Sequence, residues 1–237
     1  MRLAIPNTLA QLLAVVGTSF AVGFAAVGEI EAQVTPTQAA RVFEASRTPT
    51  TIYRDVAGKV ISNEEFVDHR MANYHSNDSA ARTVLADGTV EFRLRRIPQE
   101  GRFAPEFRFR TSDERLVTSK ELKGKVVVLN FWFIACSPCV GEMPQLNHLA
   151  AKYEKDPNVV FIALTPDPTE TVSKFLTRHK FDYRMATDAQ TVLDLFAFSG
   201  YPKNIVISKT GEIVYWRSTI RAWDKFESVI TAEVEKK

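Results

Sequence analysis

The sequence predicts an α/β protein in which helices cover a central mixed sheet. Two continuous apolar runs, 126–131 and 159–164, are typical of strands that are buried on both faces. Each run is followed by a segment with helical spacing, and a hairpin over 205–216 leads to a closing helix. An order of strand, helix, strand, helix, then hairpin and helix places helices on the faces of one mixed sheet.

The region before the first buried strand carries few structural signals. Turns are expected at 56–59 and 86–89, and the alternation over 89–97 predicts a strand. The segment 107–110 alternates phenylalanine with arginine, which we interpret as a short strand with one solvated face.

Four helices are predicted from apolar spacing and from their ends. The first has apolar residues at helical intervals, namely Met143, Leu146, Ala150 and Tyr153. The second has Asp167 as its N-cap, Pro168 in its first turn and Glu170 as a capping-box residue. A short third helix is expected over 188–198, and Trp223 marks the fourth.

Composition and the N-terminus bound the class of protein. The 237 residues are 45% apolar and 24% charged, with a net charge of +2, so nothing demands a nucleic-acid partner. An uncharged segment, 3–28, follows Arg2 and is typical of a secretory signal or a membrane anchor. The alternative is a buried N-terminal helix of a cytosolic protein.

We therefore expect three regions along the chain. Residues 1–32 are expected to be the signal or anchor, 33–101 an N-terminal extension of unknown role, and 102–237 the α/β domain. The expected location is periplasmic or extracytoplasmic, either free or held at the inner membrane by residues 3–28.

The only two cysteines are Cys136 and Cys139, separated by serine and proline. A disulfide between them closes a loop too small to stabilise the fold much, so reactivity is the better explanation of the pair. At a junction between a buried strand and a helix, the helix dipole lowers the pKa of the Cys136 thiol. Cys139 lies one turn further on. We expect Cys136 to attack a disulfide and Cys139 to resolve the mixed disulfide.

Metal binding is the main alternative for such a pair. Half of a zinc site has the same spacing, but no second pair exists, and His148 and His179 lack finger-like spacing. Haem attachment needs a histidine where Val140 stands. We expect no metal. A further polar group is interpreted as an ordinary loop and not as a metal cluster: Asp68, His69, His75 and Asp78.

Several motifs occur in an order that resembles bacterial thioredoxin-like oxidoreductases of the ResA and TlpA type, related to the AhpC/TSA redoxins. The matching segments are Lys123–Trp132, Cys136–Cys139, Glu142–Pro144 and Gly200–Pro202. The resemblance covers Phe107 to about Glu233. It implies a thioredoxin fold and a protein-disulfide oxidoreductase with no cofactor beyond the redox-active Cys136–Cys139 disulfide.

The resemblance also implies roles for individual residues. Pro202 matches the cis-proline that faces the dithiol, and we expect it to bind substrate together with Tyr201 and Trp132. Glu142 matches an acidic residue that tunes proton transfer at the dithiol, although a helix-surface carboxylate is the alternative. Pro144 matches a proline that bends the active-site helix.

Three positions depart from patterns known in related proteins. Ala135 stands where many relatives have tryptophan, and we expect the loss of that ring to widen the rim of the site. Asn130 stands where thioredoxin has a buried aspartate, a replacement that this subfamily shares. Lys203 follows the expected cis-proline. Its ammonium could favour the Cys136 thiolate, and the plainer interpretation is a solvated surface lysine.

The implied partners are exported proteins with disulfides or dithiols, apocytochromes among them, and a transmembrane thiol-electron carrier. Two other functions fit the same fold. A thiol peroxidase needs threonine three residues before its reactive cysteine, where Phe133 stands. A redox-inert docking module would keep the fold without the activity.

Overall fold

The computed structural model describes residues 49–73 and 79–236 of the chain. The apolar segment 3–28 lies outside these described residues, and so do His75 and Asp78. Among the described residues, no helix combines the length and the apolar character needed to span a membrane.

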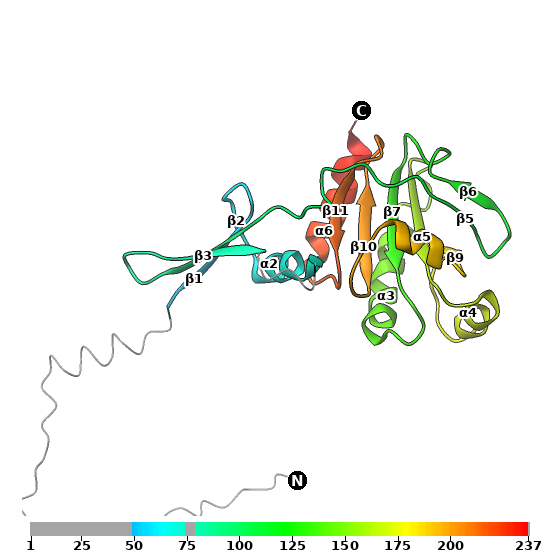
Figure 1. Cartoon of the computed structure of the whole chain (residues 1–237), viewed down its shortest axis with the longest axis horizontal. Helices are drawn as coiled ribbons and strands as arrows, with labels where there is room; N and C mark the ends of the chain where they lie inside the picture. The colour runs from blue at the N-terminus through cyan, green and yellow to red at the C-terminus, as the bar shows by residue number, and fades with distance from the viewer. Residues whose placement is uncertain (1–48, 74–78, 237) are drawn as a thin grey trace, which may run out of the picture. The chain divides into compact units, whose positions relative to one another are not determined.

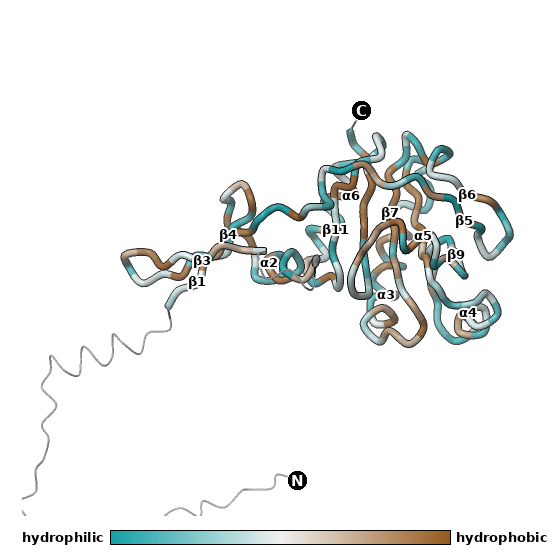
Figure 2. Tube along the Cα trace, in the orientation of Figure 1, coloured by the Kyte–Doolittle hydropathy of each residue, from teal (hydrophilic) through white to brown (hydrophobic). Residues whose placement is uncertain are grey.

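A five-stranded mixed sheet forms the centre of the C-terminal domain (Figure 1). Its strands in spatial order are β11 (Ile213–Arg217), β10 (Lys203–Ile207), β7 (Val126–Phe131), β8 (Val159–Leu164) and β9 (Arg184–Ala186). The parallel pairs are β7 with β8 and β8 with β9, whereas β10 is antiparallel to both of its neighbours. All six residues of β7 are buried, and the apolar colour follows this strand in Figure 2. The predicted central mixed sheet is confirmed.

Helices and loops cover both faces of this sheet. The helices are α3 (Ser137–Lys152), α4 (Thr169–Leu176), α5 (Gln190–Leu195) and α6 (Trp223–Glu235). Side chains of α3, α4 and α6 pack on the face that includes Val126 and Val128, and both cysteines belong to this core. Side chains of α5 pack on the opposite face, which includes Val127 and Leu129. Alternate side chains of β7 therefore belong to two separate cores.

Two predicted helix boundaries differ in the structure. Helix α4 begins at Thr169 with Pro168 as its N-cap and no side-chain capping bond, so the predicted cap at Asp167 is wrong. Helix α5 spans Gln190–Leu195 and is shorter than the 188–198 expected. The hairpin over 205–216 and the closing helix from Trp223 are confirmed.

A smaller sheet precedes this domain, within the expected extension 33–101. Its strands in spatial order are β2 (Val60–Ile61), β1 (Thr51–Arg54), β4 (Val90–Leu94) and β3 (Ala80–Val84). Helix α2 (Asn63–Arg70) packs on it through Phe66, whose ring lies 4.4 Å from that of Tyr53 and 5.6 Å from that of Phe92. The strand predicted over 89–97 is thus β4. A 3-10 helix, η1 (Met71–Asn73), follows α2.

The alternating segment at 107–110 forms β5 (Arg108–Arg110), which pairs with β6 (Leu116–Thr118). Phe107 and Phe109 are buried while both arginines are exposed, as predicted.

Asp68 and His69 are part of helix α2 and are buried, so the predicted polar loop is wrong for them. The His69 Nε2 atom lies 2.6 Å from the Arg95 carbonyl oxygen. Burial and the nearby Arg217 charge lower the pKa of His69 to about 4. Within the part of the chain that the structure describes, no three His, Cys, Asp or Glu side chains gather as a metal site.

Candidate functional site

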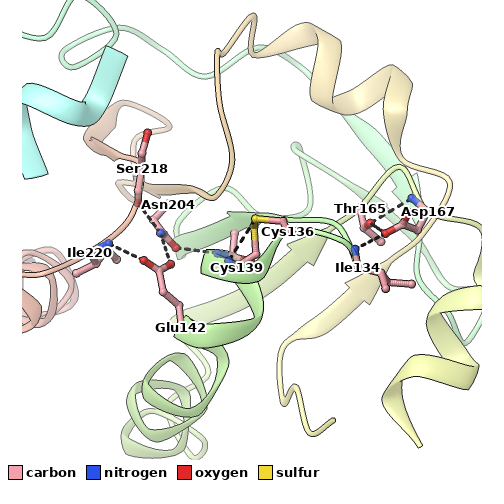
Figure 3. The surroundings of a disulfide bond; sticks show 10 residues. Ile134, Cys136, Cys139, Glu142, Thr165, Asp167, Asn204, Ser218 and Ile220 are labelled. Atoms are coloured by element: carbon pink, nitrogen blue, oxygen red, sulfur yellow. Dashed lines mark hydrogen bonds between the residues drawn. A yellow bond between two sulfur atoms is a disulfide. The ribbon is translucent and has the colours of Figure 1, made fainter. Parts of the chain in front are cut away.

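The two cysteines lie where β7 has ended and α3 begins. Cys136 is the N-cap residue of α3, and its Sγ accepts a hydrogen bond from the Cys139 N–H at 3.2 Å. The two sulfurs form a disulfide, with the Cα atoms 5.3 Å apart (Figure 3). A backbone N–H donor and the positive end of a helix both favour negative charge on a sulfur. After reduction, this position favours the thiolate form of Cys136.

The two cysteines differ in exposure. Cys136 is 6% exposed and Cys139 is 2% exposed. Ala135, Ser137 and Pro138 around them are exposed, so the motif lies at the protein surface. Cys136 is therefore the sulfur that a partner reaches more readily.

The peptide bond between Tyr201 and Pro202 is cis, as predicted. Strand β10 starts directly after it, with Lys203 paired to Phe131, the last residue of β7. Pro202 therefore lies at the same edge of the sheet as the segment that leads into α3. The Tyr201 ring packs edge-on against Phe133 at 5.0 Å between centroids.

Trp132 occupies the core and leaves no surface for a substrate. It is 0% exposed and packs against Phe175 and Phe181, with ring centroids at 5.7 and 5.8 Å. Its Nε1 has no hydrogen-bond partner among the described residues. The structure therefore assigns Trp132 to packing beneath the site and not to the predicted substrate contact.

Glu142 lies on α3, one turn beyond Cys139, and is buried at 5% exposure. Its Oε1 accepts a hydrogen bond from the Ile220 N–H at 2.6 Å, and its Oε2 accepts one from Asn204 Nδ2 at 3.1 Å (Figure 3). The Asn204 oxygen in turn accepts from Asn130 Nδ2 at 2.9 Å. A helix-surface carboxylate, the alternative weighed for Glu142, does not describe this residue.

Burial raises the pKa of Glu142 to about 7, while the Ile220 and Asn204 hydrogen bonds oppose the increase. A carboxyl group with such a pKa is present in both protonation states at neutral pH. Residues three apart on a helix share a face, so Glu142 and Cys139 project from the same side of α3. The arrangement suits a group that exchanges protons with the dithiol.

Asp167 is a site residue whose role the sequence pattern did not indicate. Its Oδ2 accepts a hydrogen bond from the Ile134 N–H at 2.7 Å and one from the Thr165 hydroxyl at 3.0 Å (Figure 3). Because Ile134 is two residues before Cys136, this carboxylate fixes the backbone that leads into the Cys136–Cys139 motif. The position of Asp167, three residues after the last residue of the buried strand β8, was the available signal.

Lys203 is fully buried, so the interpretation as a surface lysine is wrong. Its Nζ donates to the Ala72 carbonyl at 2.6 Å and to the Ser218 hydroxyl at 3.0 Å, and lies 5.3 Å from the Trp216 ring centroid. Ala72 and Trp216 belong to the core on the opposite face of the sheet from the cysteines. The proposed support for the Cys136 thiolate therefore lacks a structural basis.

The family model described as Redoxin matches residues 99–226, more than half of the chain. A relative from Bacillus cereus, named thiol-disulfide oxidoreductase ResA, is 36% identical over 118 residues, which cover 49% of this chain and 68% of the relative.

Two solved structures resemble the chain over a similar part. One, from Chlorobium tepidum, is assigned to the DsbE thiol:disulfide interchange proteins; it has a TM-score of 0.52 and 27% identity and covers 57% of this chain and 97% of its own. The other, a thiol:disulfide interchange protein of the thioredoxin family from Chlorobium tepidum TLS, has a TM-score of 0.51. At 19% identity over 58% of this chain and 99% of its own, it bears on the fold alone.

Proposed function

We propose that this chain, which belongs to the Redoxin family and has the thioredoxin fold, is an exported enzyme that reduces protein disulfides through Cys136 and Cys139. Its relatives include ResA-type thiol–disulfide oxidoreductases. The general activity, protein-disulfide oxidoreduction, follows from the family. The residues, the direction of electron flow and the location are the proposal.

One observation carries the assignment of the two cysteines. Cys136 caps α3 and accepts the Cys139 N–H at its sulfur, and it is the more exposed of the pair. These features support Cys136 as the attacking thiolate and Cys139 as the resolving thiol.

The reaction then proceeds in two displacements from the reduced dithiol. The Cys136 thiolate attacks one sulfur of the substrate disulfide, whose S–S bond breaks and releases one substrate thiolate. Cys139, after losing its proton, attacks the Cys136 sulfur of the mixed disulfide and releases the second substrate thiolate. The substrate gains two electrons, which the enzyme gives up as its Cys136–Cys139 disulfide forms. An external dithiol donor must reduce this disulfide before the next cycle.

Glu142 is the proposed acceptor of the Cys139 proton. Its position one turn along α3, its burial and its pKa of about 7 support this role. The Asn204 amide, which bonds both Glu142 and the Ser218 carbonyl, holds the carboxyl group in place.

Tyr201 and Pro202 are the proposed substrate contacts. The cis bond between them and their place beside the start of α3 support docking of an extended peptide, and the half-buried Tyr201 ring offers an aromatic surface. The proposal also includes export directed by segment 3–28, a membrane thiol carrier as the dithiol donor, and apocytochromes among the substrates. The apolar composition of that segment supports export, and the carrier and the apocytochromes follow from the resemblance to ResA- and TlpA-type oxidoreductases.

Cysteine variants test the proposal. Cys136→Ser should abolish reduction of a model protein disulfide such as insulin, because the nucleophile is lost. Cys139→Ser should instead accumulate mixed disulfides between Cys136 and partner proteins, visible by non-reducing electrophoresis in cells. Full reductase activity in Cys136→Ser protein would refute the mechanism.

A further inference from the structure

Helix α2 of the N-terminal extension supplies a buried carboxylate to the loop between β11 and α6. Asp68 is 2% exposed, and its Oδ2 accepts hydrogen bonds from the N–H groups of Arg221 and Ala222, each at 2.8 Å. The Arg221 guanidinium lies 3.9 Å from the other carboxylate oxygen. Two backbone donors on one carboxylate oxygen fix the position of the loop relative to α2.

The same loop holds Glu142. The Ile220 N–H, directly before the two amides that Asp68 binds, donates to Glu142 at 2.6 Å. The Ser218 carbonyl accepts from Asn204, which is the second partner of Glu142. Three consecutive amides of the loop therefore serve two carboxylates, one from the extension and one from the redox site.

Contacts elsewhere keep α2 and η1 in place independently of this loop. Lys203 donates to the Ala72 carbonyl, and Arg217 lies 3.3 Å from His69 Nδ1. Glu65, on the same helix as Asp68, lies 3.4 Å from the Lys225 ammonium. Because these other contacts hold α2, the position of Asp68 does not depend on the loop that it binds.

We propose that Asp68 is a positioning residue of the redox site: by binding the Arg221 and Ala222 amides, it holds the Ile220 amide against Glu142. This inference rests on the proposed role of Glu142 in proton transfer. Asp68 lies outside the segment 99–226 that the Redoxin family model matches. The inference therefore gives part of the N-terminal extension a role in catalysis.

The titratable groups around Glu142 decide how its titration reports on this arrangement. Those that face it from the packed elements are Asp68 of α2, Arg221 of the loop, and the Tyr183 and Tyr215 hydroxyl groups. The Asp68 charge raises the pKa of Glu142, whereas the Ile220 hydrogen bond lowers it. Removing the whole Asp68 side chain therefore has two opposed effects on the pKa of Glu142. The experiment must separate these two effects.

Two variants separate charge from position. Asp68→Asn removes the charge but keeps an oxygen that can accept the two amides, whereas Asp68→Ala removes both. We expect Glu142 in the oxidised full chain, followed by carboxyl-carbon NMR, to titrate about one pH unit higher in Asp68→Ala than in Asp68→Asn. The Ile220 amide should exchange its hydrogen about tenfold faster in Asp68→Ala alone.

Catalysis provides the second readout. The pH midpoint for reduction of insulin should move with the Glu142 titration in each variant, and the matched control Glu65→Gln should leave both unchanged. Equal Glu142 midpoints in the two Asp68 variants would overturn the inference. So would a Glu65→Gln shift as large as that of Asp68→Ala, because general loosening of α2 would then explain it. Activity that survives Cys136→Ser would instead refute the proposed function, and the titration in oxidised protein does not depend on that result.

Discussion

The Lys203 ammonium donates a hydrogen bond to the Ala72 carbonyl at 2.6 Å, across 131 positions of sequence. This contact joins the residue after the cis-proline to η1 of the N-terminal extension. Burial lowers the pKa of Lys203 to about 7, with a further contribution from the Arg217 charge. The junction between the extension and the redox domain therefore contains a lysine that loses its proton near neutral pH.

Stability should depend on pH through Lys203. Between pH 7 and the ordinary lysine pKa of 10.5, the unfolded chain holds a proton that the folded chain has lost. Stability therefore rises with pH in this window, by at most about 1.4 kcal/mol per pH unit. The free energy of unfolding of the wild type minus that of Lys203→Met should increase from about pH 7 to about pH 10 in urea titrations.

Lys120→Met provides the control, since it makes the same substitution at an exposed lysine. A pH-independent difference for Lys203→Met would show that Lys203 stays charged in the folded protein.

Removal of the Glu142 carboxylate should change the pH dependence of resolution. In the wild type the rate should rise as pH passes about 7, because ionised Glu142 accepts the Cys139 proton. Glu142→Gln should lose this rise and slow resolution by about 100-fold, the lower range for a general base. Stopped-flow measurement of mixed-disulfide decay tests this. An unchanged profile in Glu142→Gln would remove Glu142 from the mechanism.

Asp167 should act on the cysteine loop and not on helix α4. Asp167→Ala leaves the Ile134 N–H without its acceptor, which should cost about 1–3 kcal/mol of stability and slow alkylation of reduced Cys136. Asp167→Asn, which keeps an acceptor oxygen, should restore much of both. Glu170→Ala, at the exposed position predicted to cap α4, should change stability by less than about 0.5 kcal/mol. Equal effects of Asp167→Ala and Glu170→Ala would contradict the assignment.

Trp132 and Tyr201 should respond differently to truncation. Trp132→Ala removes a fully buried ring, so unfolding by urea should show a loss of about 3–5 kcal/mol. Tyr201→Ala removes a half-buried ring at the cis-proline and should mainly raise KM for a protein disulfide. A large rise in KM for Trp132→Ala with little loss of stability would restore Trp132 as a substrate contact.

Local patterns were sufficient to predict the sheet and the dithiol. The runs that became β7 and β8 are buried along most of their length, and such strands can be found as short continuous apolar runs that differ from the neighbouring segments. Cys136 was predicted at a helix start because its motif directly follows a buried strand, and the structure places it as the N-cap of α3.

Long-range contacts set the limit of that reasoning. Nothing near Lys203 in the sequence indicates that Ala72 covers it, so a lysine beside the site was assigned to solvent. Asp167 satisfies the local pattern of an N-cap, but the Ile134 amide, 33 positions earlier, binds its carboxylate instead. Asp68 and His69 were assigned to a loop because their partners lie beyond residue 90.

Thiolate formation at Cys136 tests the central claim most directly. In reduced full-length protein, titration of the thiolate absorbance should give a first midpoint well below the ordinary cysteine pKa of about 8.5, and alkylation at neutral pH should label Cys136 before Cys139. A first midpoint at or above about 8.5, or labelling of Cys139 first, would contradict the assignment of Cys136 as the nucleophile.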